Sequence, residues 1–164
     1  MTLIAFVLSV IVGSGSLALG YFGAGLTDFT PWLILLGVVW ILAHLRKLYW
    51  VSSVAFFITL LAAAYGVWNH FTPIWMLLSA FGGLLGWDLS DFARRLSYAA
   101  PMDDVTGMER RHLARVGVVA GLGFGLSLLS VVIHVNRLPF EVAVGLVLLA
   151  ALGLTRLVLR LRKF

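Results

Sequence analysis

Residues Asp88 to Arg115 read DLSDFARRLSYAAPMDDVTGMERRHLAR and form the long polar segment of an otherwise apolar chain. Its first half carries apolar residues at helical spacing, Leu89, Phe92 and Leu96. Pro101 ends that helix, and Thr106 with Glu109 forms a capping-box signature that starts a second one. Acidic residues and arginines balance here, which favours docking to a protein over binding to an anionic lipid surface. We therefore expect a cytoplasmic helical linker at 90–115, where the chain meets its partners.

The rest of the chain is too apolar for a soluble protein. Of its 164 residues, 62% are hydrophobic and 12% are charged, and the mean hydropathy is +1.05. Soluble domains have about 45–50% apolar and about 25% charged residues. Lipid must therefore solvate most of the surface. Because the chain has no cysteine, disulfides, thiolate metal sites and iron–sulfur clusters are excluded.

Six apolar runs predict an all-α membrane bundle of six transmembrane helices, arranged as three hairpins in one domain, residues 1–164. The expected spans are 3–20, 31–45, 49–68, 73–89, 116–135 and 139–159. The runs are continuous, whereas the strands of a membrane barrel would alternate. Two runs, 31–45 and 73–89, are at or below the lower limit of about 17 residues for a span. A re-entrant or thinned-bilayer arrangement stays open for these two.

The basic residues predict the orientation of these spans. If six helices cross alternately, all of the 12 lysines and arginines except Arg137 fall on one side. Basic residues favour the cytoplasmic side, so both termini and the linker are expected there, in a multi-pass protein of the cell (inner) membrane. The first run lacks a basic start and is interpreted as a retained span rather than a signal peptide. The net charge of +5 thus reports orientation, and we expect no nucleic-acid partner.

A short motif recurs in the first half of the chain. Phe29-Thr30-Pro31 appears again as Phe71-Thr72-Pro73. Proline at the first helical position loses no backbone hydrogen bond, so each copy predicts the start of a helix. Convergent helix starts and an ancestral duplicated hairpin both explain the repeat, and the sequence leaves the choice open.

Small residues at four-residue spacing mark helix faces that pack closely in lipid. The fifth run carries Gly117, Gly121 and Gly125. The first run carries Ser9, Gly13, Ser16 and Gly20, and the fourth carries Gly82 and Gly86. We expect these three helices to meet. A subunit interface or a pore wall remains an alternative use of the same faces.

The runs contain little that could carry chemistry. No Asp, Glu, Lys or Arg lies near the middle of a span, where a charge would indicate a functional site. The serines and threonines in the spans are expected to bond to their own helix backbone or to a neighbour. The histidines His44, His70, His112 and His134 would hold haem only as pairs on facing helices at one depth. His70 and His112 are interpreted as interfacial instead, and the sequence leaves haem binding open. We expect no catalytic residue, no metal and no cofactor.

One pattern in the polar segment is similar to part of an enzyme motif. The spacing Asp88-x-x-Asp91-x-Ala93-Arg94 partly resembles the start of the CDP-alcohol phosphotransferase motif, whose aspartates hold divalent metal at the membrane face. Phe92 stands where that family has glycine. The downstream aspartates Asp103 and Asp104 are adjacent instead of spaced. We carry no catalytic role across on this resemblance.

These observations predict a non-enzymatic subunit or scaffold of a membrane protein complex. Its partners would be the bilayer and other membrane subunits or further copies of the chain. A small channel or facilitator is the alternative, and a membrane enzyme that uses Asp88 and Asp91 comes after it. The residues expected to touch partners or lipid headgroups are Asp91, Arg94, Arg95, Arg110, Arg111, Arg160, Arg162 and Lys163.

Overall fold

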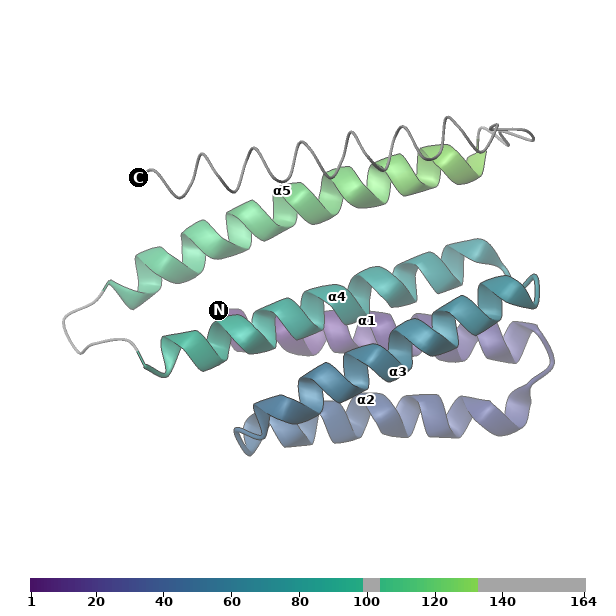
Figure 1. The fold of residues 1–164 in the computed structure, drawn as a ribbon, viewed down its shortest axis with the longest axis horizontal. Coiled ribbons are helices and arrows are strands. Elements are labelled where there is room, and N and C mark those ends of the chain that lie inside the picture. The colour runs from purple at the N-terminus through teal and green to yellow at the C-terminus, as the bar shows by residue number, and fades with distance from the viewer. Residues whose placement is uncertain (99–103, 133–164) are drawn as a thin grey trace. The chain divides into compact units, whose positions relative to one another are not determined.

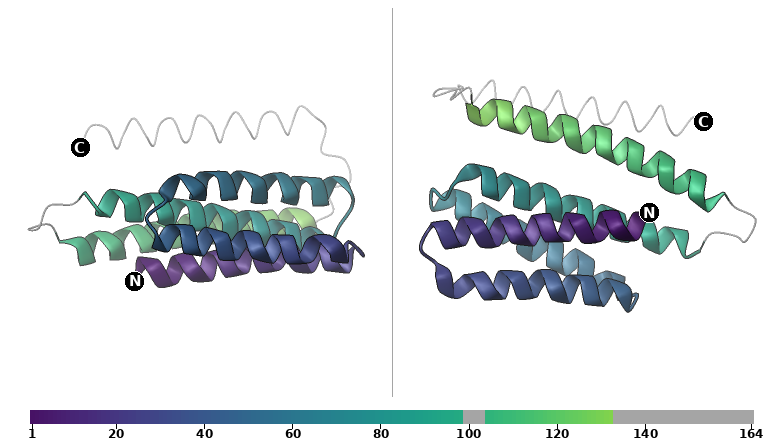
Figure 2. Two further views of the ribbon diagram at one scale, coloured as in Figure 1. Left: turned by 90° about the horizontal axis from the view of Figure 1, so that it is seen from below. Right: turned by 180° about the vertical axis from the view of Figure 1, so that it is seen from behind.

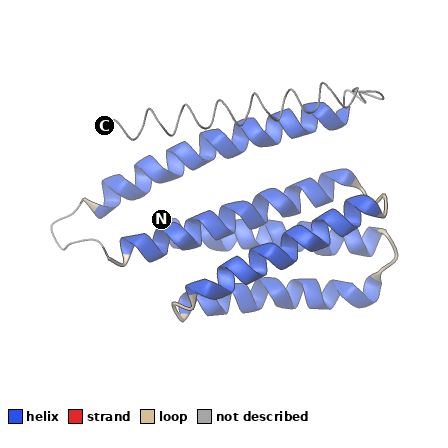
Figure 3. Ribbon diagram, viewed as in Figure 1, coloured by secondary structure: helices blue, strands red, loops and turns tan. Residues whose placement is uncertain are grey.

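The computed structural model describes residues 1–98 and 104–132, and these residues are helical with short turns (Figures 1 and 3). The helices are α1 (Thr2–Gly23), α2 (Thr30–Leu45), α3 (Tyr49–Trp68), α4 (Pro73–Leu96) and α5 (Val105–Val132). A single 3₁₀ turn, η1 (Thr27–Phe29), precedes α2. The predicted all-α fold is confirmed for the described residues. Contacts divide the chain into residues 1–129 and 130–164, and the structure reported below belongs to the first unit.

The repeated motif marks helix starts, as the sequence predicts. Pro31 and Pro73 occupy the first turns of α2 and α4. Thr72 is the N-cap residue of α4, although its side chain makes no capping hydrogen bond. The turns that precede α3 and α4 are short, and each places one residue in the left-handed region, Lys47 and His70, both at a φ of 59°.

Successive helices from α1 to α4 run in opposite directions, and α1 packs most extensively against α4 (Figures 1 and 2). Two clusters of buried side chains form the core along α1. One contains Phe6, Val10, Trp40, Ala55 and Leu89, and the other contains Leu17, Tyr21, Ala63 and Met76. The helix α1 is therefore the centre of the bundle.

Glycine lets the α1 and α4 backbones touch. A Cβ atom added at Gly82 would lie 2.5 Å from the Gly13 amide nitrogen, and one at Gly13 would lie 2.9 Å from the Gly83 nitrogen. No side chain fits at such a separation. Close approach of backbones is how small residues stabilise helix pairs in lipid.

Three of the described helices are long and apolar enough to cross a membrane. They are α1, the segment Thr27–Leu45 and α3. Over the described residues, α4 and α5 are not among these candidate spans. Helix α4 continues without a break past residue 89, the predicted end of the fourth span, through its charged turns to Leu96. The sixth expected span, 139–159, lies outside the described residues.

The start of α5 differs from the capping box expected at Thr106 and Glu109. Thr106 is already inside the helix, and Asp104 Oδ1 accepts the hydrogen bond from the Gly107 amide at 2.9 Å. Glu109 turns instead toward α1 and accepts a hydrogen bond from Thr2. A tertiary partner has replaced the local one, so the capping-box prediction is wrong.

Candidate functional site at the polar end of the bundle

The beginning of α1, the turn between α2 and α3, the end of α4 and the beginning of α5 lie at the same end of the bundle (Figures 1 and 2). We call this the polar end. Every lysine and arginine of the described residues lies in one of these segments: Arg46, Lys47, Arg94, Arg95, Arg110, Arg111 and Arg115.

A buried chain of hydrogen bonds joins three helices at the polar end. Trp40 Nε1 donates to Ser52 Oγ at 3.0 Å, the Ser52 and Ser90 hydroxyls are 2.7 Å apart, and Ser90 Oγ lies 3.0 Å from His44 Nδ1. All four side chains are buried. The His44 ring also stacks on Phe6 of α1, with 3.9 Å between ring centroids. Buried polar groups are costly unless they are bonded, so this network fixes how α2, α3 and α4 fit together.

A small polar cavity of about 110 Å³ opens beside this network. Ser52 lines it, together with Tyr49, Trp50, Ser53, Trp87, Asp91 and Arg94. Trp87 Nε1 donates to Ser53 Oγ across the cavity wall at 3.2 Å. Ser52 thus lines the cavity and is connected, through the Ser90 hydroxyl, to the buried imidazole of His44.

Two polar contacts attach α5 to the bundle at this end. His112 Nε2 lies 2.9 Å from Asp88 Oδ2, and the His112 ring stacks on Phe92 with centroids 3.8 Å apart. Thr2 Oγ1 donates to Glu109 Oε1 at 2.7 Å, and the Met1 ammonium lies 3.4 Å from Glu109 Oε2. The Thr2 hydrogen bond lowers the pKa of Glu109, and the ammonium adds to this against an opposing effect of burial.

Asp91 pairs with two arginines of its own helix, Arg94 and Arg95. Burial raises the pKa of Asp91, but hydrogen bonds and charge from Arg95 and Arg94 outweigh it and leave the pKa below its ordinary value. The two arginine side chains are mostly exposed. Asp91 does not share a site with Asp88, which bonds to His112.

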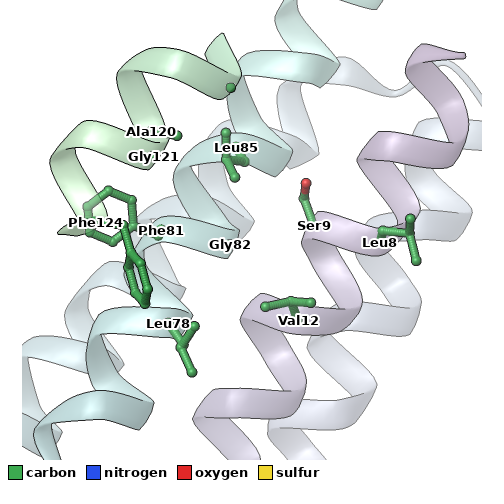
Figure 4. A pocket seen from close by; sticks show the side chains of 11 residues that line it. Leu8, Ser9, Val12, Leu78, Phe81, Gly82, Leu85, Ala120, Gly121 and Phe124 are labelled. Atoms are coloured by element: carbon green, nitrogen blue, oxygen red, sulfur yellow. The ribbon is translucent and has the colours of Figure 1, made fainter. Parts of the chain in front are cut away.

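Beyond the polar end, α5 touches α4 through an aromatic pair. The rings of Phe81 and Phe124 meet edge to face with centroids 5.4 Å apart. Two cavities remain on either side of this seam, of about 400 Å³ and about 550 Å³. The first, which we call the glycine groove, lies among α1, α4 and α5 (Figure 4). The second, which we call the α4–α5 pocket, lies between those two helices alone.

The predicted packing residues have different surroundings in the structure. Gly13 and Gly82 meet at the α1–α4 crossing, Gly86 lies close to Val10 and Trp40, and Gly20 lies close to Trp75 and Met76. Ser16 is buried on α1. Ser9 bonds to the Ala5 carbonyl and lines the glycine groove. A Cβ at Gly117, Gly121 or Gly125 would meet no described atom within 4 Å.

Several hydroxyls of the predicted spans bond to their own helix, as expected. Ser14, Thr59 and Ser127 each donate to the carbonyl four residues earlier. These groups are therefore occupied by backbone oxygens instead of lining a polar path. Ser52 and Ser90 differ, since they bond to each other and to side chains of α2.

The described histidines have separate surroundings. His44 is bonded to Ser90, His112 is bonded to Asp88, and His70 lies in the turn before α4. Among residues 1–98 and 104–132, no group of three or more His, Asp or Glu side chains is placed to hold a metal ion. His134 and the basic residues Arg160, Arg162 and Lys163 lie outside the described part of the chain.

Sequence reasoning missed the buried network. Trp40 and His44 are one helical turn apart, which places them on one face, but nothing local indicates that Ser52 and Ser90 lie opposite them. Comparison with protein-family models, with curated proteins and with solved structures finds no match to this chain.

Proposed function

We propose that this chain is a non-enzymatic subunit of a membrane protein complex and binds its partner helix in the glycine groove. The groove carries the proposal. Leu8 and Val12 of α1 form one wall, Leu78 and Gly82 of α4 lie at its base, and Gly121 of α5 lies on the opposite wall (Figure 4). Gly117 of α5 lines the groove as well. No described side chain fills the space in front of these glycines.

The chemistry of the groove suits a transmembrane helix. Its walls are nearly all apolar, and glycine lets a second backbone come close enough to gain dispersion contacts that lipid does not match. Large apolar side chains flank it and are exposed, Leu8 and Val12 on α1 and Val118 and Leu122 on α5. The partner is a helix of another subunit or of a second copy.

Intact-mass measurement of the gently solubilised chain tests this proposal. The wild type should carry a companion subunit, and Gly121→Leu should lose it because the side chain would occupy the groove. The matched control is Gly23→Leu, since a Cβ at Gly23 also meets no described atom within 4 Å and Gly23 does not line the groove. A wild-type protein that runs as a stable lone monomer would contradict the proposal.

We further propose that the chain crosses the cell (inner) membrane six times and that both of its ends lie in the cytoplasm. The gathering of basic residues at the polar end supports this topology, because basic residues favour the cytoplasmic side. The chain has no cysteine, so single cysteines can be placed at will. Ser97→Cys should be protected from a membrane-impermeant thiol reagent added outside intact cells, and Asn69→Cys should be labelled. The reverse pattern would overturn the topology.

A further inference from the structure

The α4–α5 pocket has two chemically different parts. Its body is apolar and is lined by Phe81, Leu84, Leu85, Val116, Val119 and Ala120. Its mouth is polar, with Asp88, His112 and Arg115 at the end nearest the start of α5. From His112 to Gly123 the pocket follows about 16 Å of helix at about 1.5 Å per residue. An elongated apolar body with a charged mouth matches an amphipathic ligand.

Contacts between the helices hold this pocket open at both ends. The pair of Asp88 and His112 connects the helices at the mouth, and Phe81 with Phe124 connects them further along. Gly123 lies between these two points. A Cβ there would already lie 3.4 Å from the Phe81 ring, so a larger side chain would enter the pocket.

The mouth carries charges of both signs, and its arginine can bind a phosphate. Asp88 is engaged by the His112 ring through Oδ2. Arg115, three residues further along α5, adds a guanidinium whose planar donors match the oxygens of a phosphate. Arg115 is a single exposed arginine. The segment 88–115 as a whole is charge-balanced and forms no general basic patch.

We propose that the α4–α5 pocket binds one glycerophospholipid with an anionic headgroup. The phosphate bonds to Arg115 at the polar end of the bundle, and an acyl chain lies along the apolar body between the two helices. A phospholipid satisfies both parts of the pocket at once, and it is the amphipathic molecule present at highest concentration where these helices lie.

This inference is independent of the proposed subunit role. At about 100° per residue, Gly121 and Gly123 lie about 200° apart around α5. Gly121 lines the glycine groove and Gly123 lines the α4–α5 pocket, so a variant at each position separates the two surfaces.

Native mass spectrometry of the full chain in mild detergent tests the headgroup. The protein is titrated with phosphatidylglycerol and, separately, with phosphatidylcholine that carries the same acyl chains. We expect tighter binding of phosphatidylglycerol. Arg115→Gln should weaken it about tenfold, the scale of one charge-assisted hydrogen bond, and should leave phosphatidylcholine unchanged.

The control for charge is Arg46→Gln, which removes the same charge at the polar end without lining the pocket. Equal loss in both arginine variants would mean diffuse attraction and would overturn the proposal, as would equal binding of the two lipids by the wild type.

The acyl chain is tested by filling the pocket. Gly123→Leu should weaken both lipids, and Gly121→Leu should weaken neither. The opposite result would place the lipid in the glycine groove and overturn the assignment. If circular dichroism shows that Gly123→Leu does not fold, the proposal is still tested by comparing Arg115→Gln with Arg46→Gln and by comparing the two lipids. Failure of all lipid binding by the wild type also overturns it.

Discussion

Helix α4 has two neighbours that carry the same small-residue signature, and it packs against them in different ways. Against α1, Gly82 and Gly13 bring backbone onto backbone. Against α5, the contacts are a polar pair at one end and an aromatic pair further along, with cavities beside them. Small residues at four-residue spacing therefore show which face of a helix allows close approach. They do not show which helix approaches it.

The largest effect should come from the backbone contact between α1 and α4. Gly82→Ala would place a methyl group 2.5 Å from the Gly13 amide nitrogen, and neither backbone can yield without moving a helix. Overpacking of this kind costs up to about 3 kcal/mol. We expect that loss in the free energy of unfolding, measured by titration with a denaturing detergent and followed by circular dichroism.

The matched control is Gly15→Ala on the same helix pair. Its Cβ meets no described atom within 4 Å, so the change should alter stability by less than about 1 kcal/mol, the difference in helix propensity. Equal effects at Gly82 and Gly15 would show that α1 and α4 are not in backbone contact.

A second prediction concerns the buried hydrogen-bond network that joins α4 to α2 and α3. Ser90→Ala removes the group that lies between His44 Nδ1 and Ser52 Oγ. It leaves His44 Nδ1 buried without this partner, whereas Ser52 Oγ still accepts a hydrogen bond from Trp40 Nε1. Leaving buried groups unbonded costs about 1–3 kcal/mol, so stability should fall by about 2 kcal/mol in the same titration. Ser127→Ala on α5 is the comparison, because it removes only a bond to its own helix, and its effect should be smaller.

The third prediction tests whether α5 depends on its polar contacts. The pKa of Glu109 is lowered in the folded chain, so the ionised carboxylate stabilises the contact with Thr2 and the Met1 ammonium. A lowered pKa gives stability that is present above the ordinary glutamate pKa of about 4.3 and is lost as the pH falls through the folded value. Acid should therefore loosen α5 from α1, whereas the α1–α4 seam should not respond.

Spin labels on a double variant, Ile4→Cys and Val118→Cys, would report this loosening, since both positions are exposed and the chain has no other cysteine. The distance distribution should broaden in acid. Adding Glu109→Gln should broaden it already at neutral pH and remove the dependence on pH. A distribution that stays narrow in that variant would show that other contacts hold α5.

Sequence patterns that depend only on neighbouring residues predicted much of this fold. Predictions failed where residues distant in the sequence determine the hydrogen-bond partner. Pro31 and Pro73 start helices because proline fits a first turn whatever its surroundings. The capping box failed because Thr2, more than a hundred residues away, offers Glu109 a better-placed donor. The serines show the same division. Those that bond to their own helix were predictable, and the pair of Ser52 and Ser90 depends on the packing of α3 against α4.

The smallest effect is expected at Asp91, which lies near the end of α4, beyond its backbone contact with α1. Its arginine partners are mostly exposed, and exposed ion pairs contribute about 0–1 kcal/mol. Because the pKa of Asp91 is lowered, even this contribution is present at neutral pH and disappears as the pH falls through the folded value. Asp91→Asn should therefore fold normally, lose less than about 1 kcal/mol and retain its companion subunit. If this variant kept its stability and its companion but lost the physiological activity of the complex, the Asp91 carboxylate would have a direct chemical role. That result would favour the enzyme alternative over the subunit role.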